Sequence, residues 1–178
     1  AYEIPKRDWS SDVCSSDLVL ADINEQRCVD ALKILDNPAR FSTAKVDASK
    51  KAEIVALAKA KTGSGKLASP TKSARRDNPL CGDRVTMDVR LENGRIAEVA
   101  HQVRGCLLCQ ASASALASVA IGGDSAAIAL LRHEAERALG REPGTAAAPF
   151  DAFAPVAAHK SRQDCVLLPF EALKDALS

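Results

Sequence analysis

The feature that most limits the possible folds is a β-hairpin predicted over residues 84–103. Apolar and polar residues alternate from Val85 to Leu91, which is the pattern of a half-buried strand. Asn93-Gly94 is a strong two-residue turn signal, and a second alternating run returns at 96–103. Because one face of such an antiparallel pair is apolar, helices have to cover it.

The rest of the second half of the chain supplies those helices. Helical patterns run over 52–61, 110–121, 125–139 and 166–177. Asp124 can cap the third of them, and Pro169 fits the first turn of the last one. Residues 64–77 are polar and basic and are expected to form a surface loop, whereas Phe150, Phe153 and Val156 form a short apolar patch.

Composition excludes several classes of protein. The chain of 178 residues suffices for one domain with a real core. Aromatic residues make up only 3% of the chain, so we expect a core with few large side chains, in which helices pack closely through small residues. The formal net charge of +1 gives no indication of a nucleic-acid or membrane partner. No apolar run is long enough to span a bilayer, and residues 1–18 contain no signal peptide, so a cytoplasmic location is expected.

Cysteines on both sides of the hairpin point to metal or sulfur chemistry. Cys81 and Asp83 lie just ahead of it in the sequence NPLCGD, Cys106 and Cys109 lie just beyond it, and Cys165 stands near the C-terminus. In a reducing compartment these thiols are expected to be free or metal-bound. A soft or borderline metal requires thiolates gathered from distant parts of the chain, here with one oxygen ligand.

The pair Cys106-x-x-Cys109 has further possible roles. By itself the spacing is also typical of a redox or zinc motif. The small-residue helix begins here, and its free N–H groups and dipole are expected to lower the pKa of a nearby thiol. We interpret Cys109 as a helix residue near the site rather than a ligand.

The first third of the chain has a different character. Residues 8–18, DWSSDVCSSDL, match the translation of a common short-read sequencing adapter without a gap. We interpret residues 1–18 as an artefact or disordered segment, the alternative being a natural Ser/Asp-rich linker. Cys14 and Trp9 are therefore excluded from functional reasoning.

Residues 19–50 resemble the middle of a dinucleotide-binding domain of the dehydrogenase kind. A strand ending in Asp22, a helix over 25–35 and a strand over 41–46 give a β-α-β order, with Asp22 where such domains hold a ribose hydroxyl. No G-x-G-x-x-G phosphate turn precedes it. The segment is interpreted as a chimeric fragment, with an unrelated β-α-β extension as the alternative.

Residues 51–178 resemble the U-type iron–sulfur assembly scaffolds, the family of IscU, SufU and the N-terminal part of NifU. The motifs in order are NPLCGD, the hairpin, Gly105-Cys106 followed by an Ala/Ser-rich helix, and Cys165 followed by LLPFEAL. The resemblance implies an α+β fold, in which helices pack on a small antiparallel sheet and a metal site lies at one end.

The same resemblance implies the ligands and the partners. Cys81, Asp83, Cys106 and Cys165 match the residues that bind zinc or a nascent [2Fe–2S] cluster in the family. The chain is then expected to be a scaffold or sulfur acceptor rather than an enzyme, with some sulfurtransferase activity possible. Cys106 and Cys165 are the candidate acceptors of persulfide sulfur from a SufS-like cysteine desulfurase. Apo iron–sulfur proteins would be the clients.

Three departures from the IscU pattern favour the SufU-like branch. Asp164 stands where IscU-type members have histidine, the Leu-Pro-Pro-Val-Lys chaperone motif is absent, and the segment between Cys106 and Cys165 is longer. Arg162, three residues before the last cysteine, also matches that branch and could pair with Asp83. Asp164 replaces the basic residue usual there, which leaves the local charge around Cys165 open.

Other interpretations of the same residues remain. His159 could be a substitute ligand, although a loop residue is the ordinary interpretation. His101, on a strand, and His133, on a helix, are interpreted as ordinary surface or interface histidines. Residues 19–48 could be an NAD-binding oxidoreductase fragment. The cysteine set could also be a purely structural zinc module.

Overall fold

The computed structural model describes residues 18–22, 41–45 and 48–178. Contacts divide the chain into two units, Ala1–Val46 and Asp47–Ser178. In the first unit, β1 (Leu18–Asp22) pairs in parallel with β2 (Phe41–Lys45). The two strands therefore lie where the β-α-β interpretation expected them. The helix expected over 25–35, Cys28 and the adapter-like residues 8–17 lie outside the described residues.

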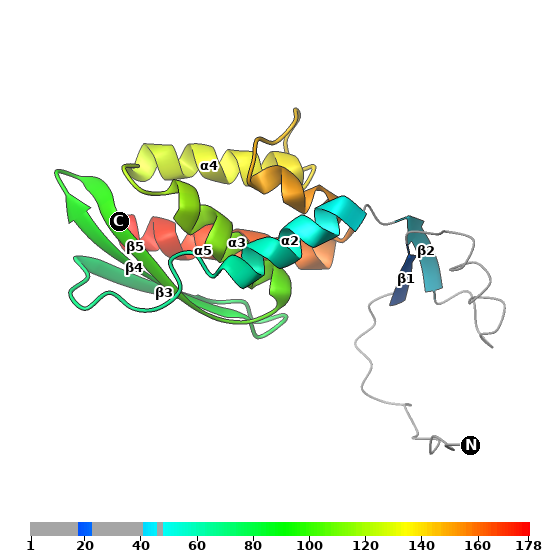
Figure 1. The fold of residues 1–178 in the computed structure, drawn as a ribbon, viewed down its shortest axis with the longest axis horizontal. Helices are drawn as coiled ribbons and strands as arrows, with labels where there is room; N and C mark the ends of the chain where they lie inside the picture. The colour runs from blue at the N-terminus through cyan, green and yellow to red at the C-terminus, as the bar shows by residue number, and fades with distance from the viewer. Residues whose placement is uncertain (1–17, 23–40, 46–47) are drawn as a thin grey trace, which may run out of the picture. The chain divides into compact units, whose positions relative to one another are not determined.

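The second unit is built on a three-stranded antiparallel sheet in the order β3-β4-β5, shown in green in Figure 1. These strands are β3 (Lys72–Asp77), β4 (Arg84–Glu92) and β5 (Arg95–Arg104). The predicted hairpin is confirmed as β4 and β5. Asn93 and Gly94 have φ angles of 51° and 76°, as a type I′ turn requires at its two central positions.

Helices cover one face of this sheet (Figure 1). They are α2 (Ala48–Ala60), α3 (Leu107–Val119), α4 (Ser125–Ala138) and α5 (Lys160–Leu177), with the 3-10 helix η2 (Phe150–Ala158) before α5. The helix α5 packs on β3 and β4, and α3 packs on β5 and against α2 and α5. The predicted α+β fold is confirmed.

The core lies between the sheet and these helices. Val85, Met87 and Val89 of β4 are fully buried on the helix-covered face. Phe150 and Phe170 pack with ring centroids 5.4 Å apart, and each large apolar side chain buried in this way contributes about 1.5–3 kcal/mol. Alanines fill much of the buried surface of α3, so its neighbours can approach closely.

A loop between α2 and β3 covers part of the opposite, outer face of the sheet. Gly63 and Gly65 hydrogen-bond to the backbone of His101 at the free edge of β5. The Leu67 N–H then donates to Asp88 Oδ2 at 3.3 Å, and the Ser73 hydroxyl donates to Asp88 Oδ1 at 2.6 Å. The loop therefore covers the outer face near Asp88.

Two expectations were wrong at element level. Residues 72–77 form the edge strand β3 rather than a loop; almost all of its side chains are exposed, so no apolar alternation marks it. The last helix begins at Lys160 instead of 166, which places Pro169 in its interior. Pro169 has no N–H for the carbonyl of Cys165, but it is fully buried in the core, and that packing offsets the missing hydrogen bond.

Candidate metal centre

The NPLCGD segment folds into a compact turn that presents Cys81. The buried Asn78 organises it, because its Oδ1 accepts the Leu80 N–H at 2.9 Å and its carbonyl accepts the Gly82 N–H at 2.8 Å. The Asn78 N–H in turn donates to the Asp83 carbonyl at 2.8 Å. Gly82 has a φ of 75°, which a glycine adopts without strain. The Cys81 thiol is thereby held at the exposed tip of a fixed loop.

Asp83 is buried, with 5% of its surface exposed, and is only half satisfied. Its Oδ1 accepts the backbone N–H of Cys106 at 3.1 Å. Its Oδ2 is buried and has no hydrogen-bond partner. A buried carboxylate oxygen without a partner is costly, so a ligand for it is expected.

Gly105 allows this close approach of the two ends of the hairpin. A Cβ at position 105 would lie 2.7 Å from Asp83 Cγ and 2.9 Å from its Oδ1. No real side-chain carbon tolerates such distances, so only glycine can precede Cys106 while Asp83 keeps its position. In the sequence, only the glycine at position 105 indicated that a close contact exists there. The glycine did not identify Asp83 as the partner, because Asp83 lies 22 residues earlier in the chain.

Three of the four predicted ligands are brought together. The Sγ atoms of Cys81 and Cys165 are 3.6 Å apart, and the donor atoms of Cys81, Asp83 and Cys165 all lie within 4.8 Å of one another. The half-buried Cys106 is outside that set, although its thiol interacts with both Asp83 and Cys165.

Burial is the main cause of the raised pKa values of the thiols of Cys106, Cys109 and Cys165. It raises the pKa of Cys165, and the neighbouring thiols of Cys106 and Cys81 raise it further. Burial also raises the pKa of Cys106, while the N–H of Cys109 at the start of α3 lowers it. The pKa of Cys109 is raised by burial as well. The expectation that the helix start would favour thiolate was therefore wrong, because desolvation of the charged form outweighs the helix N–H groups.

The donor set fits a zinc or iron site. Thiolate sulfur with one carboxylate oxygen suits either ion, and the orphaned Oδ2 of Asp83 is the oxygen that such an ion would engage. A cation beside Cys106 and Cys165 would stabilise their thiolate forms, which burial alone disfavours.

Arg162 and Asp164, which precede Cys165, do not make the contacts that the sequence suggested. Among the described residues Arg162 forms no ion pair, with Asp83 or any other acid. Asp164 instead accepts from Arg141 at 2.8 Å, and Arg141 also donates to Gln163 at 2.7 Å. The longer segment between Cys106 and Cys165 therefore supplies a cation that neutralises Asp164. No sequence signal indicated Arg141, because the pairing spans 23 residues.

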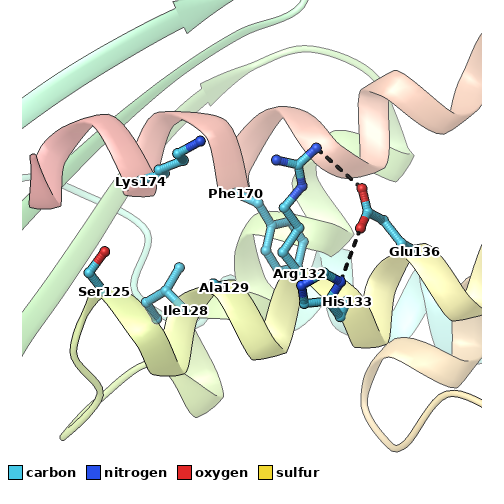
Figure 2. A pocket seen from close by; sticks show the side chains of 8 residues that line it. All are labelled: Ser125, Ile128, Ala129, Arg132, His133, Glu136, Phe170 and Lys174. Carbon is cyan, nitrogen blue, oxygen red and sulfur yellow. Dashed lines mark ion pairs between the residues drawn. The ribbon is translucent and has the colours of Figure 1, made fainter. Parts of the chain in front are cut away.

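A second group of titratable residues lies on α4 and in the loop after it. His133, Glu136 and Glu142 place their donor atoms within 4.8 Å of one another. Figure 2 shows Arg132 and His133 both turned toward Glu136 beside a hollow lined by Phe170 and Lys174. Arg132 pairs with Glu136 at 3.2 Å and with Glu171 at 2.8 Å. These ion pairs engage the carboxylates of Glu136 and Glu171, whereas the buried Nε of Arg132 has no hydrogen-bond partner. His159 belongs to neither donor set among the described residues.

Fold and site together define a small α+β domain with a cysteine-rich candidate metal site at one end of its sheet. Residues 49–177 match the family described as NifU-like N terminal domain. The iron–sulfur cluster assembly scaffold protein IscU of Thermotoga maritima is 29% identical over 132 residues, covering 70% of this chain and 89% of that protein. The chain therefore belongs to the NifU-like N-terminal domain family.

Solved structures agree with this assignment. The N-terminal part of a nitrogen-fixing NifU-like protein from Brucella abortus superposes with a TM-score of 0.64 at 31% identity, covering 70% of this chain and 88% of that one. The putative SUF-system scaffold FiSufU from Fervidobacterium islandicum gives 0.64 at 28% identity, covering 71% and 94%. None of the helices in the described ranges is both long and apolar enough to cross a membrane.

Proposed function

We propose that the chain is an iron–sulfur cluster assembly scaffold and sulfur acceptor that binds zinc or iron through Cys81, Asp83, Cys106 and Cys165. The observation that supports it most is the convergence of Cys81, Asp83 and Cys165 within 4.8 Å around an oxygen without a partner. The relatives named as scaffolds, IscU of Thermotoga maritima and FiSufU, favour the same function.

Zinc or iron bound at the centre would supply positive charge that keeps the thiols in their thiolate form. The chain's own residues arrange the ligands around it. Asn78 fixes the Cys81 loop, Gly105 lets Asp83 reach Cys106, and α5 holds Cys165 in the core. The carboxylate is a harder ligand than thiolate, so Asp83 is the ligand most easily displaced from a soft metal.

Sulfur acceptance is a thiol–persulfide exchange. The thiolate of the acceptor attacks the terminal sulfur of the donor's Cys–S–SH; a new S–S bond forms on the acceptor, and the donor cysteine leaves as thiolate. Exposure decreases from Cys81 through Cys106 to Cys165. Because the incoming donor has to reach the attacking sulfur, Cys81 is the first acceptor, and Cys106 and Cys165 receive sulfur later or hold the ion.

The proposal is tested by loading the purified full chain with a cysteine desulfurase and L-cysteine and measuring persulfide by intact mass. Wild-type protein should gain sulfur, and Cys81→Ser should lose most of that gain. Cys165→Ser and Asp83→Ala should also reduce bound metal, measured by elemental analysis. A wild-type chain that binds metal but never gains sulfur would instead be the structural zinc module.

We further propose that the expected 51–178 domain, which α2 extends to Asp47, is the functional unit, and that residues 1–18 and 19–46 are foreign to it. The parallel pair β1 and β2, with Asp22 at the end of β1, supports a dinucleotide-binding origin for 19–46. Titration of the chain with NAD should show no binding, because no G-x-G-x-x-G phosphate turn precedes β1 in the sequence. Saturable binding would support the oxidoreductase alternative.

A further inference from the structure

The outer face of the sheet carries a row of charged side chains directly beside the metal centre. In the strand register Asp77 lies opposite Arg84, and Arg84 lies opposite Arg104. Val85 points into the core, so its neighbour Arg84 and the paired residues project to the outer face. Arg84 follows the ligand Asp83 in the chain, and Arg104 precedes Cys106 by two residues.

This part of the outer face is hollowed rather than filled. Near Asp88 the loop from Gly63 to Leu67 covers the sheet. Towards the metal centre the same face forms a hollow of about 500 Å³. Its lining is polar and basic, and comprises Ser64, Gly65, Lys66, Arg84, Thr86, His101, Gln102, Val103 and Arg104.

Positive charge in and around the hollow is in excess. Asp77 accepts from both Arg75 at 2.9 Å and Arg84 at 2.6 Å. Lys66 and Arg104 have no acidic partner among the described residues. Like charges opposite each other on a sheet destabilise it, and Asp77, shared between Arg75 and Arg84, offsets only part of the repulsion between Arg84 and Arg104. An acidic ligand would offset the rest.

We propose that this basic hollow, formed by Lys66, Arg84, Thr86, Gln102 and Arg104, is the docking site for an acidic segment of the protein that donates sulfur to the metal centre. The inference rests on the proposed function. Carboxylates of the segment would meet Lys66 and Arg104, and Thr86 and Gln102 would supply hydrogen bonds at the floor. Docking there places the donor beside the exposed Cys81.

The charge arrangement favours an acidic peptide over a nucleic acid. The chain as a whole has a formal charge of only +1, whereas nucleic-acid sites use extended basic surfaces. Asp77 also lies within the row of cations and would oppose a continuous phosphate backbone. A short segment with a few carboxylates fits the small hollow without meeting Asp77.

The first experiment measures binding of a fluorescein-labelled peptide of alternating Glu and Asp to the zinc-loaded full chain by anisotropy. We expect saturable binding at low salt that weakens as salt screens the charges. The double variant Lys66→Glu/Arg104→Glu should bind at least about tenfold more weakly. The matched control Lys51→Glu/Lys59→Glu changes net charge equally on the exposed side of α2 and should stay within about twofold of wild type.

The second experiment measures the rate of sulfur acceptance from a cysteine desulfurase. In the Lys66→Glu/Arg104→Glu variant the rate should fall at low donor concentration and recover at high donor concentration, with metal content unchanged. Equal effects in the patch and control variants, or none in either, would overturn the docking site. So would tighter binding of a labelled DNA oligonucleotide that depends on the same two residues. Failure of wild-type protein to accept any sulfur would contradict the proposed function instead.

Discussion

Gly105 and Asp83 show how closely the metal centre depends on single residues. The carboxylate occupies the space that any side chain at 105 would need. At the same time it receives the N–H of Cys106 through one oxygen and leaves the other free. The position of a proposed ligand is therefore set by a residue that has no side chain. The resemblance to a family predicted the ligand residues but not this contact.

Gly105→Ala should displace Asp83 and weaken the centre. Relief of the close contact requires a backbone or side-chain shift, which for an overpacked site costs about 1–3 kcal/mol. We expect a lower midpoint of urea unfolding and weaker zinc binding by competition with a chelator. In an Asp83→Ala background the same substitution should cost less, since the two closest contacts are gone; equal costs in both backgrounds would contradict the explanation.

His101 makes stability depend on pH. Its Nε2 lies 2.8 Å from the Thr62 carbonyl, its Nδ1 is buried without a partner, and burial lowers its pKa below the ordinary 6.5. The unfolded chain therefore binds the proton more readily. The contribution of His101 to stability is complete above pH 6.5 and is lost as the pH falls from there to the folded-state pKa.

Urea unfolding of metal-free protein between pH 7.5 and 5 should show this loss, and His101→Gln should reduce the slope. His133 and His159 are present in both proteins, so the difference between the two curves isolates position 101. Identical slopes would show that His101 is not the responsible group.

At the scale of elements, the sequence predicted those that have their own local signal. The hairpin was visible from its alternation and its Asn-Gly turn, and α4 from its apolar spacing and Asp124. The strand β3 was missed because an exposed edge strand needs no apolar face. The first turn and a half of α5 was missed because its polar residues resemble a loop, yet Gln163 is buried against the carbonyls of Leu139 and Ala157.

The start of α4 provides a test of these local signals. Asp124 Oδ1 accepts the Ala127 N–H at 2.9 Å, and this hydrogen bond lowers the pKa of the carboxyl. Asp124→Ala removes a partner from the first helical turn and should lower the urea midpoint with an unchanged slope. Asp124→Ser keeps a capping oxygen and should recover most of the loss. A midpoint that is unaffected by Ala would mean that tertiary packing alone sets the start of α4.

At the scale of the whole molecule, the proposed ligands come from separate parts of one unit. Cys81 and Asp83 lie in the turn before β4, Cys106 lies at the start of α3, and Cys165 lies in α5. The sequence could name these residues through the family resemblance. It could not show their distances, because these depend on how the sheet and α5 pack.

Residues 47–178 should fold and bind metal without the preceding segment. Among residues 49–178, whose burial the structure describes, the buried core cluster runs from Ile54 to Ala176. A chain limited to 47–178 should show the full chain's unfolding midpoint and its metal content, measured by circular dichroism and elemental analysis. A chain of this length that stays unfolded would show that residues 1–46 contribute to the core.

Cys81 is exposed and Cys165 is buried, so the candidate metal site has a solvent side and an interior side. Cys81 stands on an exposed turn and can swing away while every helix and strand stays in place. Cys165 lies in the middle of the buried surface of α5 and can retreat only if that helix shifts. Among the thiolates that would hold an ion or cluster, Cys81 on the solvent side should therefore detach before Cys165 on the helix. A receiving protein would have only to replace that one thiolate at the surface to begin a transfer.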